Sequence, residues 1–111
     1  MIIKVPDTAS PAAIAQSRAD ASMSRRDFAV LSAKQGWITE AEAMEWAGGN
    51  GIPAIAASAI GTLPEDDQFE MRMSVLTRTK VWRTDKLVRM LMAIKNVSPE
   101  SMDNHFGVAT K

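Results

Sequence analysis

The chain has 111 residues, of which 46% are hydrophobic, and its 13 basic and 13 acidic residues leave no formal net charge at pH 7. This length suits one small domain, and the apolar fraction is that of a globular protein, which excludes disorder as a general description of the chain. The lack of cysteine excludes disulfides, thiolate metal sites and thiol nucleophiles.

The N-terminal stretch MIIKVP is the one β-like segment of the sequence, because Ile2, Ile3 and Val5 precede a proline. Six residues do not form a sheet alone, so we expect these three side chains to bind a neighbouring subunit, for example at the edge of its sheet. The stretch lacks the long apolar core and basic lead of a signal peptide, and no apolar run is long enough to cross a membrane. We therefore expect a protein that is made and folded in the cytoplasm, without membrane contact.

The segment that follows is rich in small residues. Ser10 and Pro11 have the pattern of a helix N-cap followed by a first-turn proline, but Ile14 is the only large apolar side chain in the stretch AAIAQSRADAS. We interpret residues 1–22 as an N-terminal arm, extended or partly helical, whose order depends on what it contacts, and residues 23–111 as a helical domain.

The helical domain begins with a helix between Ser24 and Gly36. Ser24 and Asp27 have the spacing of a capping box, with aspartate in place of the usual glutamate, and Phe28 and Leu31 follow at helical spacing. Glycine at position 36 suits the residue just past a helix end, where the backbone adopts a left-handed conformation. The sequence therefore predicts an abrupt end to this helix.

A second helix follows directly, because Thr39 and Glu42 form an S/T-x-x-E capping box and Ile38 precedes it as a hydrophobic staple. A helix–glycine–helix unit is also typical of DNA-binding helix-turn-helix proteins. The second helix, TEAEAMEWA, carries three glutamates and no basic or amide side chain, so we exclude DNA recognition through it. Trp46 is difficult to place inside a small core, and we expect it to be exposed for a partner.

The glycine-rich stretch GGNG at 48–51 lacks the preceding strand and the following Lys-Ser or Lys-Thr of a phosphate-binding loop, so we interpret it as a link between helices. A third helix begins at Pro53 and ends near Gly61. Thr62 and Glu65 then have the spacing of another capping box, which predicts the start of a fourth helix.

The fourth helix has an acidic start and a predicted buried face. Its acids suit the positive end of a helix dipole; they are Glu65, Asp66, Asp67 and Glu70. Phe69, Met73 and Leu76 are spaced i, i+4 and i+7, which predicts that this face packs into the core.

A basic stretch follows, in which residues 72–95 contain seven basic side chains and one acid. Basic side chains that alternate with an aromatic ring can bind a phosphate backbone and stack a base. The neutral charge of the whole chain instead favours a face that contacts protein, and nucleic-acid binding is kept as the alternative. The side chains assigned to this surface are Arg78, Lys80, Trp82, Arg83 and Arg89.

A fifth helix begins at Asp85, with Leu87, Leu91 and Ile94 at helical spacing. A last short helix follows the cap Ser98-Pro99. Four methionines fall on the predicted core faces, where they serve as filler; these are Met44, Met73, Met90 and Met102. The elements together predict an all-α fold, a compact bundle of five or six short helices with helix-turn-helix hairpins and an extended N-terminal arm.

The sequence offers no catalytic constellation. His105 is the only histidine, with no thiol to activate and no substrate pocket indicated near it, and we expect it to cap helix carbonyls or to lie on the surface. The clustered acids lie at a helix start and do not follow the EF-hand pattern. We therefore expect no catalytic residues, no cofactor and no metal.

Several short motifs resemble a group of short proteins of tailed bacteriophages and prophages, which are encoded near the tail and tail-fibre genes. The element Gly-Trp-Ile-Thr at 36–39 is also similar to that of small XkdX-type phage proteins. The similarity covers roughly residues 24–106, and the motifs that carry it are RDFA at 26–29, QGWIT at 35–39, IP at 52–53, LP at 63–64, RTDKLV at 83–88 and DNHF at 103–106.

The resemblance implies a phage setting and brings no catalytic residues with it. It implies a small tail, baseplate or fibre-associated component, or an assembly factor, that acts through protein–protein contacts. The expected partners are other phage structural proteins and a second copy of the chain, and the expected location is the virion or the cytoplasm of the bacterial host.

Overall fold

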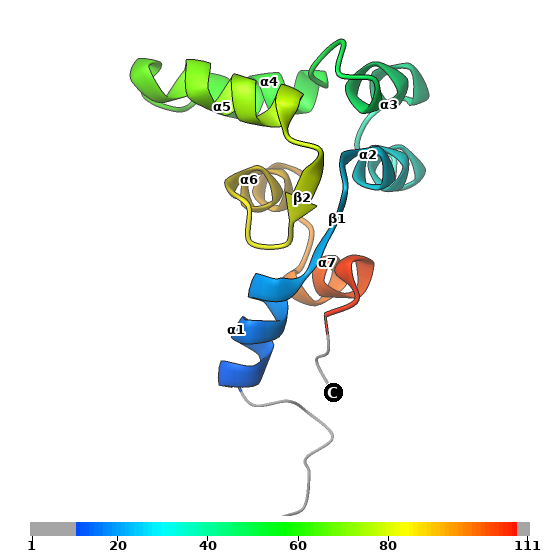
Figure 1. Cartoon of the computed structure of the whole chain (residues 1–111), viewed down its shortest axis with the longest axis vertical. Coiled ribbons are helices and arrows are strands. Elements are labelled where there is room, and N and C mark those ends of the chain that lie inside the picture. The colour runs from blue at the N-terminus through cyan, green and yellow to red at the C-terminus, as the bar shows by residue number, and fades with distance from the viewer. Residues whose placement is uncertain (1–10, 109–111) are drawn as a thin grey trace, which may run out of the picture.

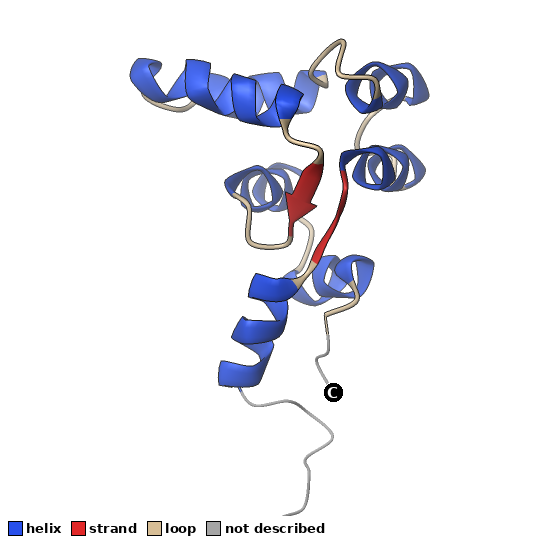
Figure 2. Cartoon of the chain, in the orientation of Figure 1, coloured by secondary structure: helices blue, strands red, loops and turns tan. Residues whose placement is uncertain are grey.

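The computed structural model describes residues 11–108, and within them the fold is mostly helical, with seven helices and one two-stranded antiparallel sheet (Figures 1 and 2). The helical class was predicted correctly, whereas the number of helices was underestimated and the sheet was missed. The elements are α1 (Pro11–Asp20), β1 (Ser22–Ser24), α2 (Arg25–Lys34), α3 (Glu40–Ala47), α4 (Ala54–Gly61), α5 (Glu65–Thr77), β2 (Lys80–Trp82), α6 (Lys86–Lys95) and α7 (Pro99–Phe106).

The small sheet joins the two halves of the chain. In its centre Met23 of β1 lies opposite Val81 of β2, and Val81 is buried. Each strand connects two helices, α1 to α2 and α5 to α6, so the strand pair holds two helix–strand–helix units together (Figure 2). Strands of three residues are stable only because helices cover them. The β-like segment predicted from the sequence, residues 1–6, lies outside the described residues.

The hairpin of α2 and α3 follows the capping chemistry of its sequence. Gly36 has a φ of 77°, which ends α2, and the Thr39–Glu42 capping box is present in both directions. Ile38 is buried at the corner between the two helices. The second carboxylate oxygen of Glu42 accepts a hydrogen bond from the backbone N–H of Ala54 at 2.7 Å, which ties the start of α3 to the start of α4.

Aromatic rings form the centre of the core. The ring of Phe28 lies 5.7 Å from Trp46 in an edge-to-face arrangement and 5.8 Å from Phe106. Trp46 is only 1% exposed, and its indole N–H donates to the carbonyl oxygen of Val75 at 3.0 Å. The prediction that Trp46 faces a partner is therefore wrong, because the indole fills the core and satisfies a carbonyl near the end of α5.

Helix α5 presents a different face to the core from the one predicted. Val75 is buried and Met71 packs against the core, whereas Phe69 is 67% exposed and Met73 is 45% exposed. At about 100° per residue, positions 71 and 75 lie on the side of the helix opposite to 69 and 73. Apolar side chains lie on two opposite sides of α5. Packing against α4 buries the side with Met71 and Val75 and leaves the side with Phe69 and Met73 exposed.

Three further local predictions are wrong. Met44 and Ile94 were assigned to the core and are 77% and 49% exposed. The capping box at Thr62 is absent, since Pro64 is the N-cap of α5 and the Thr62 hydroxyl donates to the carbonyl of Ala59. At Met44 and Ile94 the helical spacing is correct, but the neighbouring helices pack against another face of α3 and of α6.

Candidate functional site

The structure separates the side chains that the sequence assigns to a partner surface. Ile2, Ile3 and Val5 lie outside the described residues. Trp46 and Arg83 are buried. Of the remainder, Arg78, Lys80 and Trp82 lie in and just before β2, and Arg89 is exposed on α6. The basic stretch is therefore not one continuous surface.

Arg83 takes part in a buried ionic cluster with Arg18 and Asp103. The Nε of Arg83 donates to Oδ1 of Asp103 at 2.8 Å, and Arg18 donates through Nε and Nη2 to the same carboxylate, at 2.7 Å for the shortest contact. Asp103 is fully buried and Arg83 is 5% exposed. The cluster links α1, α7 and the end of β2. The prediction that Arg83 binds a partner is wrong, because its charge is neutralised inside the protein.

The electrostatics of this cluster favour the charged carboxylate. Burial alone would raise the pKa of Asp103, but the hydrogen bonds from Arg18 and Arg83 and their positive charges outweigh it. The pKa of Asp103 therefore lies below its ordinary value. The same hydrogen bond raises the pKa of Arg18. Asp103 remains ionised at neutral pH and acts as a structural anchor.

The aromatic ring of the basic stretch is already engaged. The Lys80 ammonium lies 5.4 Å from the centre of the Trp82 ring, at cation–π distance, and Trp82 is half-buried. A base that stacked on Trp82 would have to displace this lysine. The arrangement is therefore less suited to single-stranded nucleic acid than the sequence indicated.

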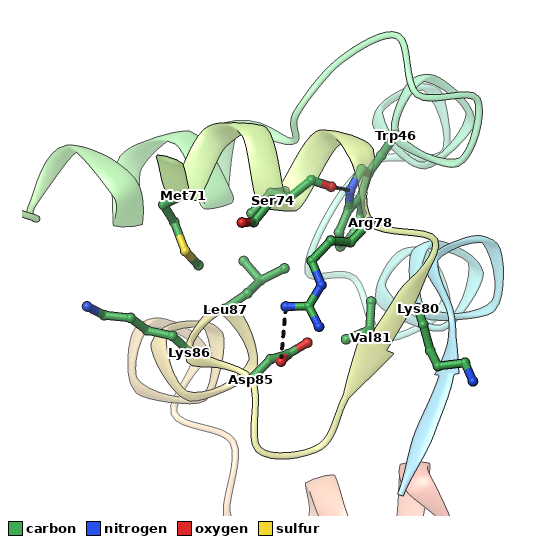
Figure 3. A pocket seen from close by; sticks show the side chains of 10 residues that line it. Trp46, Met71, Ser74, Arg78, Lys80, Val81, Asp85, Lys86 and Leu87 are labelled. Atoms are coloured by element: carbon green, nitrogen blue, oxygen red, sulfur yellow. Dashed lines mark hydrogen bonds and ion pairs between the residues drawn. The ribbon is translucent and has the colours of Figure 1, made fainter. Parts of the chain in front are cut away.

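A cavity of about 110 Å³ lies between α5, β2 and α6 (Figure 3). Its volume is well below the range of about 300–1,000 Å³ that is typical of small-molecule sites. Apolar side chains form much of its wall, and the residues that line it are Trp46, Met71, Ser74, Val75, Arg78, Lys80, Val81, Asp85, Lys86 and Leu87. The cavity is large enough for one apolar side chain of a partner.

A loose ion pair joins two of the residues that line this cavity. Arg78 reaches from the end of α5 toward Asp85 at the start of α6, and the closest charged atoms are 3.8 Å apart (Figure 3). The Arg78 side chain is 53% exposed, and Asp85 also accepts a hydrogen bond from the backbone N–H of Trp82 at 2.8 Å. An exposed pair at this distance contributes little stability, so a ligand can displace it at low cost.

A second, shallower hollow continues from the cavity along α5 and has a volume of about 280 Å³. It shares Met71, Ser74 and Lys86 with the cavity and is otherwise lined by Leu63, Asp67 and Glu70. We call the two hollows together the α5–α6 groove. Asp67 and Glu70 line its end near the start of α5, Arg78 and Lys80 line its end near β2 together with Asp85, and Lys86 lines both hollows.

His105 does not face the groove. Its ring packs edge-to-face on Trp37 at 5.8 Å and is half-buried, rather than lying on the surface or capping a helix as expected. Among residues 11–108, no group of three or more histidine, cysteine, aspartate or glutamate side chains is arranged to hold a metal ion.

The second candidate surface is the exposed face of α5, which sequence analysis assigned to the core. Phe69 and Met73 lie one turn apart on it, with the acids Asp66 and Glu70 on one side and Arg72 on the other. The sequence carries a signal for this surface, namely that α5 has two apolar stripes on opposite sides. A helix that is apolar on two faces either lies in a core or binds on both sides.

Comparison of the chain with protein-family models, curated proteins and solved structures finds no match. No helix in the described part combines the length and the apolar character needed to span a bilayer. Function is therefore inferred from the surfaces of the chain itself and from the short sequence motifs.

Proposed function

We propose that this protein is a non-enzymatic docking protein of a tailed bacteriophage, a small tail, baseplate or fibre-associated component or an assembly factor for such structures. The observation that carries the docking role is the exposure of Phe69 and Met73 on α5. The phage setting is supported by the motif resemblance over roughly residues 24–106. The two parts of the proposal therefore have separate support.

The exposed face of α5 is an efficient place to gain binding free energy. Burial of one large apolar side chain contributes about 1.5–3 kcal/mol relative to leaving it in water. Phe69 and Met73 are adjacent on one helix face, so a single apolar surface can cover both. Phenylalanine is rigid and methionine is adaptable, and together they suit the centre of a protein interface.

The charges around this face define the expected partner. Asp66 and Glu70 lie beside Phe69 and Met73 on one side of α5, and the exposed Arg72 borders Phe69 on the other side. Complementary potentials steer association and fix its register. The proposed partner is therefore a phage structural protein with an apolar patch that carries basic side chains on the side facing Asp66 and Glu70.

The alternative, a nucleic-acid-associated protein that acts through residues 72–95, receives less support from the side-chain geometry. Arg83 is bound to Asp103, Lys80 lies over Trp82, and Arg78 faces Asp85. A salt titration of binding to DNA and RNA separates the two functions, since phosphate binding weakens steeply with salt. Binding at low salt that follows this dependence would favour the alternative.

Mass spectrometry of purified phage particles and of tail assembly intermediates tests the proposed function. A virion component is present in the particles, whereas an assembly factor is present only in the intermediates. If neither fraction contains the chain, the proposed function is wrong.

A further inference from the structure

We propose that α1 is a displaceable arm, which can leave the body of the protein and unfold while the body stays folded, and that Arg18 is the latch that holds it in place. The body is defined as residues 21–108. This inference goes beyond the proposed function, which uses neither α1 nor Arg18. In Figure 1, α1 lies beyond β1, at the end of the described chain opposite to α5.

Helix α1 gains little from apolar packing. None of its ten side chains is buried, and its one large apolar side chain, Ile14, is not among those that pack against the core. Gln16 and Asp20 bind each other within the helix. Isolated helices shorter than about 12–15 residues are marginal in water. Helix α1 therefore stays helical only while the body, or another surface, holds it.

A forked ion pair connects α1 to α7. Nε of Arg18 donates to both carboxylate oxygens of Asp103, at 2.9 and 3.1 Å, and Nη2 donates to one of them at 2.7 Å. Charge-assisted hydrogen bonds of this kind are roughly twice as strong as neutral ones. Glu100, in the first turn of α7, also attracts the Arg18 charge. The Arg18 side chain is nevertheless 32% exposed, so water can replace these bonds when the helix leaves.

The departure of Arg18 does not leave a buried charge alone. Nε of Arg83 also donates to Asp103, at 2.8 Å, and Nη2 of Arg83 donates to the carbonyl of Pro99 at 3.3 Å. The buried carboxylate and the buried guanidinium therefore remain paired inside the body when α1 opens. A buried charge without its partner is strongly destabilising, and this arrangement avoids that cost. The opening of α1 is thus less costly than the unfolding of the body.

The boundary between the arm and the body lies at Ala21. The carbonyl of Ala21 accepts a hydrogen bond from the backbone N–H of Arg83 at 3.0 Å, and the next residue, Ser22, pairs with Trp82 in the sheet. Ala21 also packs against the core. The contacts of the body thus begin directly after α1. Because local unfolding proceeds in contiguous segments, residues 11–20 can open as one unit.

An open arm gives the protein a second state. In this state one side of the Asp103 carboxylate is uncovered, and residues 11–20 are free to fold on another surface. Transitions of a segment between order and disorder are a common switching device. Because α1 and α5 lie at opposite ends of the described chain, the opening leaves the proposed docking face of α5 in place.

Hydrogen–deuterium exchange of the full-length chain, followed by NMR, tests this inference. The amides of residues 15–20 are bonded within α1. We expect them to exchange at least about 100-fold faster than those of Ala29 and Ser32 in α2, because the arm opens without global unfolding. Arg18→Gln removes the fork and keeps the helix propensity. It should accelerate exchange from α1 at least about tenfold, while α2 stays at least about 100-fold slower than α1.

The matched control is Arg26→Gln, which removes the same charge from an exposed ion pair with Asp27. It should leave exchange from α1 within about twofold of the wild type. The indole N–H resonance of Trp46 reports on the body and should keep its wild-type position in Arg18→Gln.

Three results would overturn the inference. In the first, α1 of the wild type exchanges as slowly as α2. In the second, Arg18→Gln leaves exchange from α1 unchanged, or Arg26→Gln accelerates it equally. In the third, Arg18→Gln shifts the Trp46 resonance to its unfolded position, because the body then unfolds together with the arm. Binding of a phage protein through Phe69 is measured separately and does not depend on these outcomes.

Discussion

The guanidinium of Arg83 and the carboxylate of Asp103 are joined by a 2.8 Å hydrogen bond inside the protein, with Asp103 fully buried. Arg18 of α1 binds the same carboxylate. One acid of α7 thus binds two arginines, one of which lies in the stretch that the sequence indicates as a binding surface. The cluster explains how a helix with no buried side chain, α1, is attached to the rest of the fold.

Removal of the Asp103 charge should destabilise the protein strongly. We expect Asp103→Asn to lower the free energy of unfolding by about 3 kcal/mol or more, because it leaves the buried charge of Arg83 uncompensated. Urea denaturation measures the change. Asp27→Asn is the control, since Asp27 pairs with Arg26 on the surface and should change stability by less than about 0.5 kcal/mol. Equal effects of the two substitutions would contradict the structural role of the cluster.

The same cluster should make stability depend on acid pH. The pKa of Asp103 is lower in the folded protein than its ordinary value of 3.8, so the folded state prefers the ionised form. Its contribution to stability is present above about pH 4 and is lost as the pH falls through the lowered pKa. We expect the urea concentration at the unfolding midpoint to decrease when the pH is lowered below about 4. In Asp103→Asn we expect a smaller decrease. A parallel decrease in both proteins would assign the acid sensitivity to other groups, such as Glu42, whose pKa is also lowered by backbone hydrogen bonds from Ala54 and Thr39.

Trp46 should be more important for stability than Trp82. Trp46→Phe removes the hydrogen bond to the carbonyl of Val75 and leaves a small void beside Phe28, so we expect a loss of about 1–3 kcal/mol. Trp82→Phe, at a half-buried position, should cost less. Thermal and urea unfolding of both variants measure the difference. A larger loss for Trp82→Phe would contradict the assignment of Trp46 to the core.

Two glycines should respond differently to alanine. Gly36 has a φ of 77°, where a side chain strains the backbone although no atom blocks it, and Gly61 has an ordinary φ and open space around its α-carbon. We expect Gly36→Ala to destabilise the protein by about 1–2 kcal/mol and Gly61→Ala to be neutral or stabilising. The comparison of their unfolding free energies isolates the backbone conformation, since both sites have room for a methyl group.

Local chemistry explains which parts of the fold were predictable. The capping box of Thr39 and Glu42 and the Ser98-Pro99 start of α7 depend on residues within one turn, and the structure confirms both. The capping box at the start of α2 is only half formed. The Ser24 hydroxyl accepts a hydrogen bond from the backbone N–H of Asp27, whereas the carboxylate of Asp27 accepts one from the side chain of Arg26. Signals that act over a few residues were therefore read correctly in most places.

Long-range packing explains what was not predictable. The strand sequences SMS and KVW are too short to carry an alternating pattern, and they pair only because the helices bring them together. The buried stripe of α5 and the burial of Trp46 depend on contacts with other helices. The candidate site in the structure therefore differs from the predicted one. Arg78 and Lys80 line the groove, whereas Trp46 stabilises the core behind it.

The dissociation constant of the chain with the proposed partners, purified phage tail, baseplate and fibre proteins, compared between the wild type and Phe69→Ala, tests the proposed docking role most directly. We expect the substitution to weaken binding by about 10- to 100-fold, because Phe69 would be buried at the centre of the interface. Ile94→Ala, which removes a comparably exposed apolar side chain from α6, should bind like the wild type. Binding of Phe69→Ala that equals the wild type would contradict docking through α5.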